Sequence, residues 1–163
     1  MKEWILESLS IIERNNCDAL LLGGFSGSVI ELLGRCLCKH TNDVRCFEDF
    51  LEDYLPKYYP YLNVLYGCLR CEGAHAILAQ NGVMLSCEKD WEEKHLKYNI
   101  NPETKRHSLF IYSPVFVQDL KEAINKFMDQ ALTDVKFQNN INKVHAEIFS
   151  KGQKIIKEEI DKI

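Results

Sequence analysis

The sequence predicts a mostly α-helical single domain: a helical bundle that carries a small antiparallel β-hairpin or a three-stranded insertion. Apolar residues recur every three to four positions through most of the chain, which is the spacing of amphipathic helices. This pattern changes around Asn81-Gly82, where short apolar runs flank a typical hairpin dipeptide. The chain is 163 residues long and 46% hydrophobic, which suffices for one buried core. We therefore expect one domain over residues 1–163.

The first two helices are predicted within residues 2–37. Residues 2–14 place apolar side chains at helical spacing with glutamates outside the stripe, and Asn15-Asn16 ends the pattern. A second helix is expected over residues 17–37. Its interior holds glycines, each of which weakens a helix by about 1 kcal/mol relative to alanine, so they imply either close helix packing or a local break. These are Gly23, Gly24 and Gly27.

The same glycine-rich stretch does not match a nucleotide-binding loop. Such a loop ends in Lys followed by Ser or Thr and connects a strand to a helix, whereas residues 23–28 lack that ending and follow a helical pattern. Ser26 and Ser28 also lack the strand-to-helix turn that exposes a nucleophilic serine. The sequence therefore argues against both functions here.

A third and a fourth helix are predicted before residue 76. Thr41-Asn42-Asp43 supplies the polar residues favoured at a helix start, and Pro56 ends the third helix. Residues 57–60 are expected to lead into a fourth helix, which has Pro60 near its first turn and carries Arg70 and His75 on its closing turns. Its buried stripe is expected to consist of Tyr61, Leu62, Leu65 and Leu69.

The insertion is predicted over residues 76–112. Residues 76–80 and 83–86 flank Asn81-Gly82 and predict an antiparallel hairpin. Residues 88–106 are polar and predict irregular structure, and residues 107–112 predict a third strand. A long amphipathic helix is then expected from Ser113-Pro114 through Ala131, followed by a last helix from Asp134 that becomes polar toward its end.

Composition favours a soluble, cytoplasmic protein without a membrane partner. The 20 Lys and Arg against 24 Asp and Glu give a net charge of −4, so binding to nucleic acid would need a local basic patch. Glu3 and Glu7 stand where a secretory signal would be apolar, and no run approaches the length of a membrane span. The seven cysteines are an odd number spread through helical patterns, which favours reduced thiols.

The candidate functional residues lie between Leu65 and His75. Arg70 carries a permanent charge that can hold a phosphate through two parallel hydrogen bonds, and His75 can take or give a proton near neutral pH. Together they have the chemistry to cleave RNA without a metal, with the 2′-hydroxyl attacking the adjacent phosphorus. Five positions on a regular helix place the two residues about 140° apart. A symmetric dimer, or a helix that ends before His75, would bring such pairs around one cleft.

These residues resemble the motif of the HEPN superfamily. In that superfamily a late helix of an all-helical bundle carries an arginine, four to six further residues and a histidine. Here Arg70-Cys71-Glu72-Gly73-Ala74-His75 follows Leu65-Tyr66-Gly67-Cys68-Leu69, which is similar to the lead-in of small bacterial members. The resemblance implies a homodimeric helical bundle with Arg70 and His75 as a ribonuclease pair, and we add Glu72 as a candidate orienting group.

The resemblance also implies a biological setting. HEPN proteins are often toxins or antiviral defence effectors that act on RNA, and others are inactive binding modules, so an antitoxin or regulatory partner is implied. Cys71 departs from the Asn, Asp or His that commonly follows the arginine, and a thiol is a weaker hydrogen-bond partner. The alternative is a non-catalytic dimerisation or regulatory module, in which Arg70 pairs with an acid such as Glu72 and His75 caps a helix end.

Two groups of thiols and histidines leave a zinc site as a further alternative. They are Cys68, Cys71 and His75 in one group and Cys36, Cys38 and His40 in the other. Structural zinc ligands normally lie on knuckle turns, whereas these cysteines fall on helical faces, where buried thiols are ordinary core residues. We therefore predict no metal ligand and no cofactor.

Positive charge gathers around the insertion and is the best candidate for an RNA-binding patch, with a solvated loop as the alternative. The residues are Lys94, His95, Lys97, Lys105, Arg106 and His107. The histidines outside the motif are expected at the surface, and they are His40, His95, His107 and His145.

Overall fold

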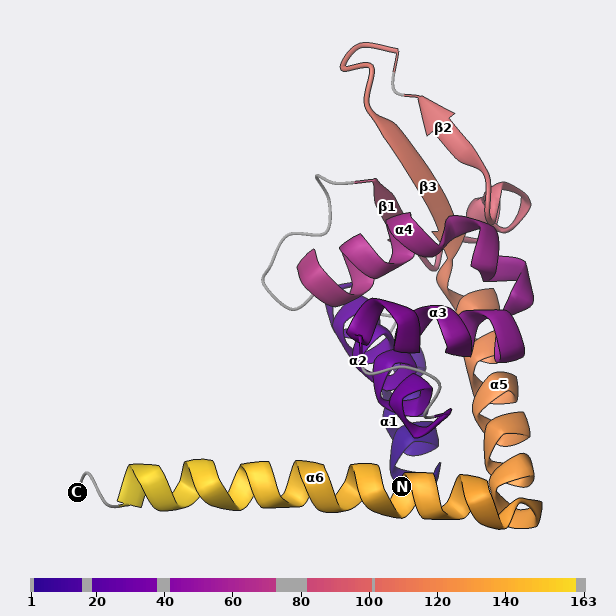
Figure 1. Ribbon diagram of the computed structural model, residues 1–163. Helices are drawn as coiled ribbons and strands as arrows, with labels where there is room; N and C mark the ends of the chain where they lie inside the picture. The colour runs from indigo at the N-terminus through magenta and orange to yellow at the C-terminus, as the bar shows by residue number, and fades with distance from the viewer. Residues whose placement is uncertain (1, 16–18, 38–41, 73–81, 101, 161–163) are drawn as a thin grey trace.

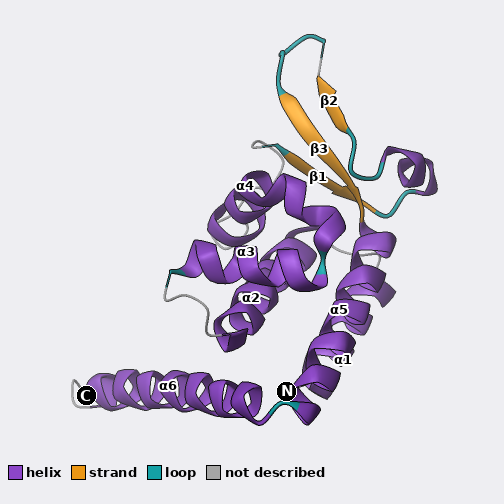
Figure 2. Cartoon of the chain, turned by 45° about the vertical axis from the view of Figure 1, so that its right-hand side comes forward, coloured by secondary structure: helices purple, strands orange, loops and turns teal. Residues whose placement is uncertain are grey.

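The computed structural model is mostly helical and carries a three-stranded sheet, which confirms the predicted fold class (Figures 1 and 2). It describes residues 2–15, 19–37, 42–72, 82–100 and 102–160. The α-helices are α1 (Lys2–Arg14), α2 (Ala19–Leu37), α3 (Asp43–Tyr54), α4 (Leu62–Leu65), α5 (Ser113–Thr133) and α6 (Val135–Ile160). The other helical segments are η1 (Pro56–Tyr61), η2 (Tyr66–Glu72) and η4 (Lys89–Lys94). The strands are β1 (Val83–Ser86), β2 (Tyr98–Ile100) and β3 (His107–Tyr112).

Aromatic side chains hold α3, η1 and α5 together. Phe50 of α3 contacts Phe127 of α5 with ring centroids 5.9 Å apart, and Tyr58 of η1 contacts Phe116 of α5 at 5.2 Å. All four side chains are fully buried. Because burying one such side chain contributes about 1.5–3 kcal/mol, these contacts are a large part of the core. α2 packs against α3 and η2 and thereby connects the motif helix to this core.

The glycines of α2 belong to a continuous helix, so the predicted local break does not occur within residues 23–28. Close packing is clearest farther along the helix, at Gly34. A Cβ atom at this position would lie 1.9 Å from the backbone oxygen of Cys46 on α3. Only glycine therefore lets α2 and α3 approach this closely.

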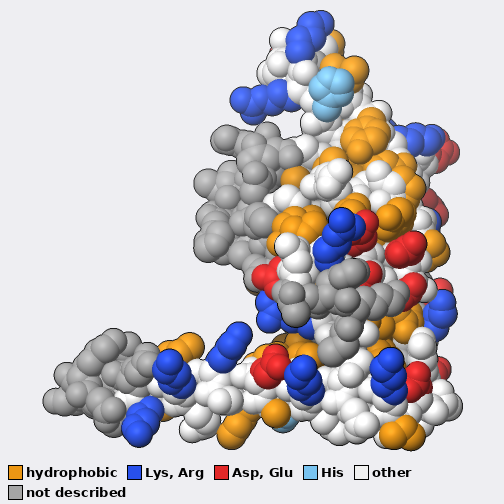
Figure 3. Space-filling view, viewed as in Figure 1, with side chains coloured by type: hydrophobic (Ala, Val, Ile, Leu, Met, Phe, Trp, Pro, Cys, Tyr) orange, Lys and Arg blue, Asp and Glu red, His pale blue; other side chains and the backbone are white. Residues whose placement is uncertain are grey.

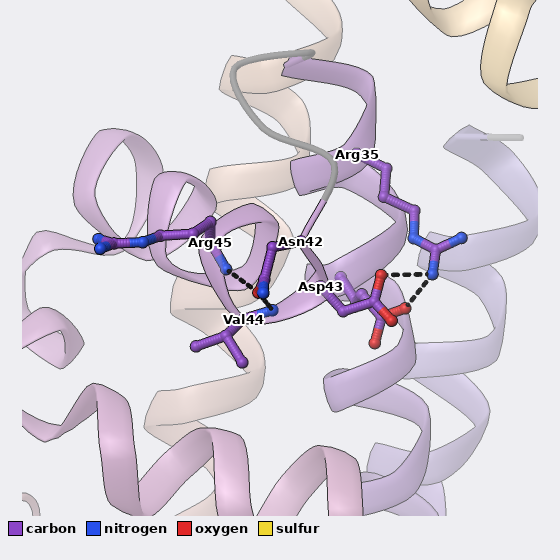
Figure 4. Close-up of polar contacts among 6 residues, drawn as sticks. Arg35, Asn42, Asp43, Val44 and Arg45 are labelled. Carbon is purple, nitrogen blue, oxygen red and sulfur yellow. Dashed lines mark hydrogen bonds and ion pairs between the residues drawn. The ribbon is translucent and has the colours of Figure 1, made fainter.

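Polar contacts fix the start of α3 beside α2 (Figure 4). The Asn42 side chain accepts hydrogen bonds from two backbone N–H groups of the first turn, at 2.9 and 3.3 Å. Arg35 of α2 pairs with Asp43 at 2.7 Å and with Glu31 at 3.0 Å. The predicted helix start is confirmed, because Asn42 satisfies donors that a helix N-terminus leaves unpaired.

The sheet has the strand order β1-β3-β2 and is mixed rather than antiparallel throughout. β1 runs parallel to β3, and β2 runs antiparallel to it. The third strand predicted at residues 107–112 is confirmed. The segment 88–106 is more ordered than predicted, since it contains η4 and β2. The predicted hairpin partner, residues 76–80, lies outside the described residues.

The predicted fourth helix, from about Pro60 to His75, is wrong in its winding over the residues that the structure describes. The described part has a 3₁₀ segment (η1), one α-helical turn (α4) and a π-helix (η2). Pro56 and Pro60 explain the first change, because proline donates no backbone hydrogen bond and clashes with the preceding turn of an α-helix. The change to π winding falls at the start of the motif.

α6 gives the molecule an L shape in Figure 1, because it runs across the end of the body and continues beyond it. Its start is fixed by Asp134, whose carboxylate accepts a hydrogen bond from the backbone N–H of Phe137 at 3.1 Å. Phe137 is 5% exposed and packs on Phe127 of α5. The first turns of α6 therefore belong to the core.

Candidate functional site

The predicted motif begins on a well-anchored helix. Leu65, Cys68 and Leu69 are 0%, 4% and 1% exposed, so they fix α4 and η2 against the body. The backbone of Arg70 and Glu72 lies on the last turn of η2. The side chains of residues 70–72 and the whole of His75 lie outside what the structure describes, so the geometry between the predicted site residues stays a prediction.

The π winding of η2 bears directly on the spacing of the motif. A π-helix closes i→i+5 hydrogen bonds, and such bulges occur frequently at functional sites. Tyr66, the first residue of η2, packs its ring on Phe47 with centroids 5.4 Å apart. In a π-helix, residues five positions apart lie on the same face of the helix. On an α-helix, the same residues lie about 140° apart around the axis.

A second polar cluster, which the sequence did not indicate, links the insertion to the body. The Tyr58 hydroxyl donates to Asp119 Oδ2 at 2.6 Å and lies 3.2 Å from Nε2 of His95. Nδ1 of His95 accepts a hydrogen bond from the backbone N–H of Tyr112 at 3.1 Å. A neutral His95 ring therefore carries its proton on Nε2, which points at the Tyr58 oxygen. Lys57 completes the cluster through an ion pair with Asp119.

The surroundings of this cluster hold both ring systems neutral. Burial, followed by the hydrogen bond to Asp119, raises the pKa of Tyr58 far above its usual value. Burial, followed by the charge of Lys57, lowers the pKa of His95, and the charge of Asp119 opposes this only in part. The prediction of a surface His95 is thus wrong: the ring is partly buried and bonded through both nitrogens.

The cluster forms a structural tie rather than a catalytic site. Its donors and acceptors satisfy one another, which fixes the segment after η4 against η1 and α5. A cavity of about 270 Å³ lies beside it and is lined by Lys57 and Asp119 together with Lys126 and Glu122. Two lysines and two carboxylates give this cavity no net preference for one sign of charge, and its lining includes no residue of the motif. Sequence patterns do not reveal this cluster, because Tyr58, His95 and Asp119 come from three distant segments of the chain.

Only some of the candidate zinc ligands lie within the residues that the structure describes. Cys36 and Cys68 are buried in the helical body. Within the part of the chain that the structure describes, no group of three or more His, Cys, Asp or Glu residues has the arrangement of a metal site. Cys38, His40, His75 and the side chain of Cys71 lie outside that part.

Only part of the predicted basic patch lies at the exposed end of the insertion, since Lys97 lies opposite Phe110 at the end of the ribbon nearer the body. Figure 3 shows Lys and Arg side chains at the tip of the β2–β3 ribbon, away from the helical body. Lys97, Lys105, Arg106 and His107 are exposed. Tyr98, with 55% of its area accessible, lies at the opposite end of β2 from this tip, where its ring contacts Tyr61 of η1 with centroids 5.6 Å apart. Cations interleaved with an exposed ring are the usual contacts of single-stranded nucleic acid.

Comparison of the chain with protein-family models, curated proteins and solved structures gave no match. Within the described residues, no helix combines the length and the apolar character needed to pass through a membrane. The HEPN resemblance therefore rests on the motif residues and on the helical fold.

Proposed function

We propose that this protein is a HEPN-like protein that acts on RNA as a metal-independent endoribonuclease. In this proposal Arg70 clamps the phosphate, His75 acts as general base or acid, and Glu72 orients one of them. The observation that carries it is the Arg70 to His75 motif, whose described residues 70–72 lie on the last turn of a helix that Leu65, Cys68 and Leu69 bury against a mostly helical body. The wider proposal is a homodimer that serves as the toxin of a toxin–antitoxin pair or as an antiviral defence protein.

The winding of η2 supports this proposal as far as Glu72, because it departs from the α-helix on which five positions set two side chains about 140° apart. Arg70 and His75 are five positions apart, which suits a π-helix and not an α-helix. The π segment covers Tyr66–Glu72 and therefore includes Arg70. The π winding is described as far as Glu72, and the orientation of His75 relative to Arg70 is part of the proposal.

The proposed reaction is an internal transfer at phosphorus. The 2′-hydroxyl loses its proton to His75, and its oxygen bonds to the adjacent phosphorus. The bond from phosphorus to the 5′-oxygen breaks, and that oxygen takes up a proton from water. Arg70 stabilises the extra negative charge on the phosphoryl oxygens. The products are a 2′,3′-cyclic phosphate and a 5′-hydroxyl, and no oxidant or metal is consumed.

The exposed basic ribbon supports RNA as the substrate. The whole chain carries a net charge of −4, so attraction to RNA must be local. Lys105 and Arg106 supply local charge at the tip of the β2–β3 ribbon, and Lys97 supplies it at the other end of β2, next in sequence to the exposed Tyr98. Each phosphate contact would make RNA binding weaken as salt rises.

Cys71 favours a second candidate function, a non-catalytic dimerisation or regulatory module, because a thiol is a weaker hydrogen-bond partner than the residues common at this position. In that case Arg70 pairs with an acid and His75 caps a helix end, so both are structural. Replacing Cys71 by asparagine, the residue common in active members of the resembled superfamily, separates the two candidates. A catalytic site gains activity from Cys71→Asn, and a structural site gains none.

The test is cleavage of end-labelled single-stranded RNA and transfer RNA by the purified protein with excess chelator. Wild type is compared with Arg70→Ala, His75→Ala and a control, His145→Ala, at an exposed histidine of α6. We expect the two motif variants to lose about 100-fold or more in rate, the lower end of general acid–base effects, and the control to keep wild-type activity. Absence of cleavage by wild type, or equal cleavage by all four proteins, would leave the module as the better account.

A further inference from the structure

His95 joins the insertion to the helical body at the point where β3 continues into α5. Nδ1 of His95 accepts a hydrogen bond from the backbone N–H of Tyr112 at 3.1 Å. Tyr112 is the last residue of β3, and α5 begins at the next residue (Figure 2). On the other side of the ring, Nε2 lies 3.2 Å from the hydroxyl oxygen of Tyr58 in η1. Because His95 directly follows η4, this one side chain holds the end of η4 to both elements.

The partners of His95 fit its neutral ring and not its protonated form. The Tyr58 hydroxyl donates to Asp119 at 2.6 Å, so its oxygen faces the proton on Nε2, and Nδ1 carries no proton. Protonated histidine carries a proton on both nitrogens. The N–H of Nδ1 would then point at the N–H of Tyr112, with the two nitrogens 3.1 Å apart and no acceptor between them. Protonation of His95 therefore breaks its contact with Tyr112.

The charges that face the His95 ring do not compensate for this loss. Lys57 of η1 and Asp119 of α5 are paired with each other. Burial lowers the pKa of His95, the charge of Lys57 lowers it further, and the charge of Asp119 opposes both. On η4 the side chains of Glu92 and Lys94 are exposed, and Glu92 offers His95 only its backbone carbonyl. Within the described residues, no carboxylate bonds to His95, so nothing there accepts a second ring proton.

We propose that His95 is a pH-sensitive latch, which holds η4 against the body when the ring is neutral and releases it when the ring is protonated. After release, β2 stays attached, because the Tyr61 hydroxyl donates to the Leu96 carbonyl at 2.7 Å, and β3 stays paired with β1. Since the pKa of His95 is lowered from 6.5, the latch is closed above that pH and opens below it. The latch involves no residue of the Arg70 to His75 motif and stands independently of RNA cleavage.

The first test is hydrogen exchange of single backbone amides in the full chain, measured by NMR between about pH 8 and about pH 5, where histidine titrates. Each rate is expressed as a protection factor, which removes the intrinsic pH dependence of exchange. We expect the protection of the Tyr112 amide to fall about tenfold or more, as for the loss of one buried hydrogen bond. The Leu109 amide bonds to the Gly82 carbonyl at 2.6 Å within the sheet, and its protection should stay constant.

Substitutions of His95 separate the effect of the proton from the effect of the contact. His95→Asn places an amide oxygen near the position of Nδ1, which accepts from Tyr112 and does not titrate, so protection of the Tyr112 amide should be high at both pH values. His95→Ala supplies no acceptor, and protection should be low at both. The control His145→Asn removes an exposed histidine of α6 and should leave the pH response unchanged.

Trp91 reports the release of η4 itself. Its ring contacts Phe110 of β3 with centroids 4.6 Å apart. The chain has two tryptophans, so Trp4→Phe leaves Trp91 as the only one. In this background, the emission maximum should shift to longer wavelength as the pH falls, and adding His95→Asn should abolish the shift.

Three results would overturn the proposal. The first is constant protection of the Tyr112 amide in wild type, and the second is the same pH response in His95→Asn. The third is an equal loss of protection at Leu109, because the whole sheet would then be opening rather than η4 alone. A Trp91 emission that does not follow the response of Tyr112 would contradict the release of η4.

Discussion

Replacing Tyr58 by phenylalanine tests whether the polar cluster holds the insertion to the helical body. The substitution keeps the buried ring and its contact with Phe116 but removes the hydroxyl. Asp119 then loses a donor that lies 2.6 Å away, and Nε2 of His95 loses the oxygen that it faces. Lys57 remains paired with Asp119, so the carboxylate is not left without a partner.

The expected loss follows from the charge of the acceptor. A hydrogen bond to an ionised group contributes about 1.5–3 kcal/mol, and the remaining ion pair with Lys57 favours a value near the lower end. We therefore expect Tyr58→Phe to lower the free energy of unfolding by about 2 kcal/mol. For a chain of this size, that corresponds to a fall in Tm of about 4–8 °C.

Urea and thermal denaturation followed by circular dichroism measure this change. The neighbouring Tyr59→Phe is a matched control, because the Tyr59 hydroxyl donates to Glu48 at 3.1 Å on an exposed side chain. It should leave the unfolding midpoint almost unchanged. Equal midpoints for the two variants, or a loss below about 0.5 kcal/mol for Tyr58→Phe, would refute the structural role of the cluster.

Three further predictions concern stability. Gly34→Ala should lower the free energy of unfolding by about 3 kcal/mol, because its Cβ would meet the backbone of α3. The control Gly67→Ala has open space around it and should lower the free energy of unfolding far less. Equal losses of the two variants in denaturant titrations would contradict this. Asn42→Ala should cost about 1 kcal/mol and Asn42→Asp much less, since aspartate also accepts the two capping bonds. The lowered pKa of His95 means that the unfolded chain binds this proton more readily. The contribution of neutral His95 to the free energy of unfolding should therefore be complete above pH 6.5 and decline as pH falls below it. His95→Gln should flatten this part of the plot of unfolding free energy against pH, and an unchanged slope would be inconsistent with this.

Local sequence signals predicted most of the fold. Asn42, Pro56 and Ser113-Pro114 mark helix boundaries because capping and the geometry of proline act within a few residues. Strand pairing is different, since β1 pairs with a strand more than twenty residues later in the chain. Periodicity also assumes one winding for a whole helix, so it missed the change from 3₁₀ to α to π over residues 56–72.

The sequence predicted the candidate site only as a motif of spaced residues and not as an arrangement in space. Arg70 and His75 are close in the chain, so their spacing is visible there, while their mutual orientation depends on helix winding. Tyr58, His95 and Asp119 show the opposite case, because they meet only through the packing of η1, α5 and the segment after η4. No spacing rule connects residues that tertiary structure alone brings together.

In the reaction that we propose, the RNA 2′-hydroxyl is the nucleophile and acts through Arg70 and His75. The most direct measurement compares a labelled RNA oligonucleotide with one that carries a single 2′-deoxy nucleotide at the mapped cleavage position, both with excess chelator. We expect cleavage of the RNA to a 2′,3′-cyclic phosphate and no cleavage at the deoxy position. Equal cleavage of both substrates, or no cleavage of either, would contradict it.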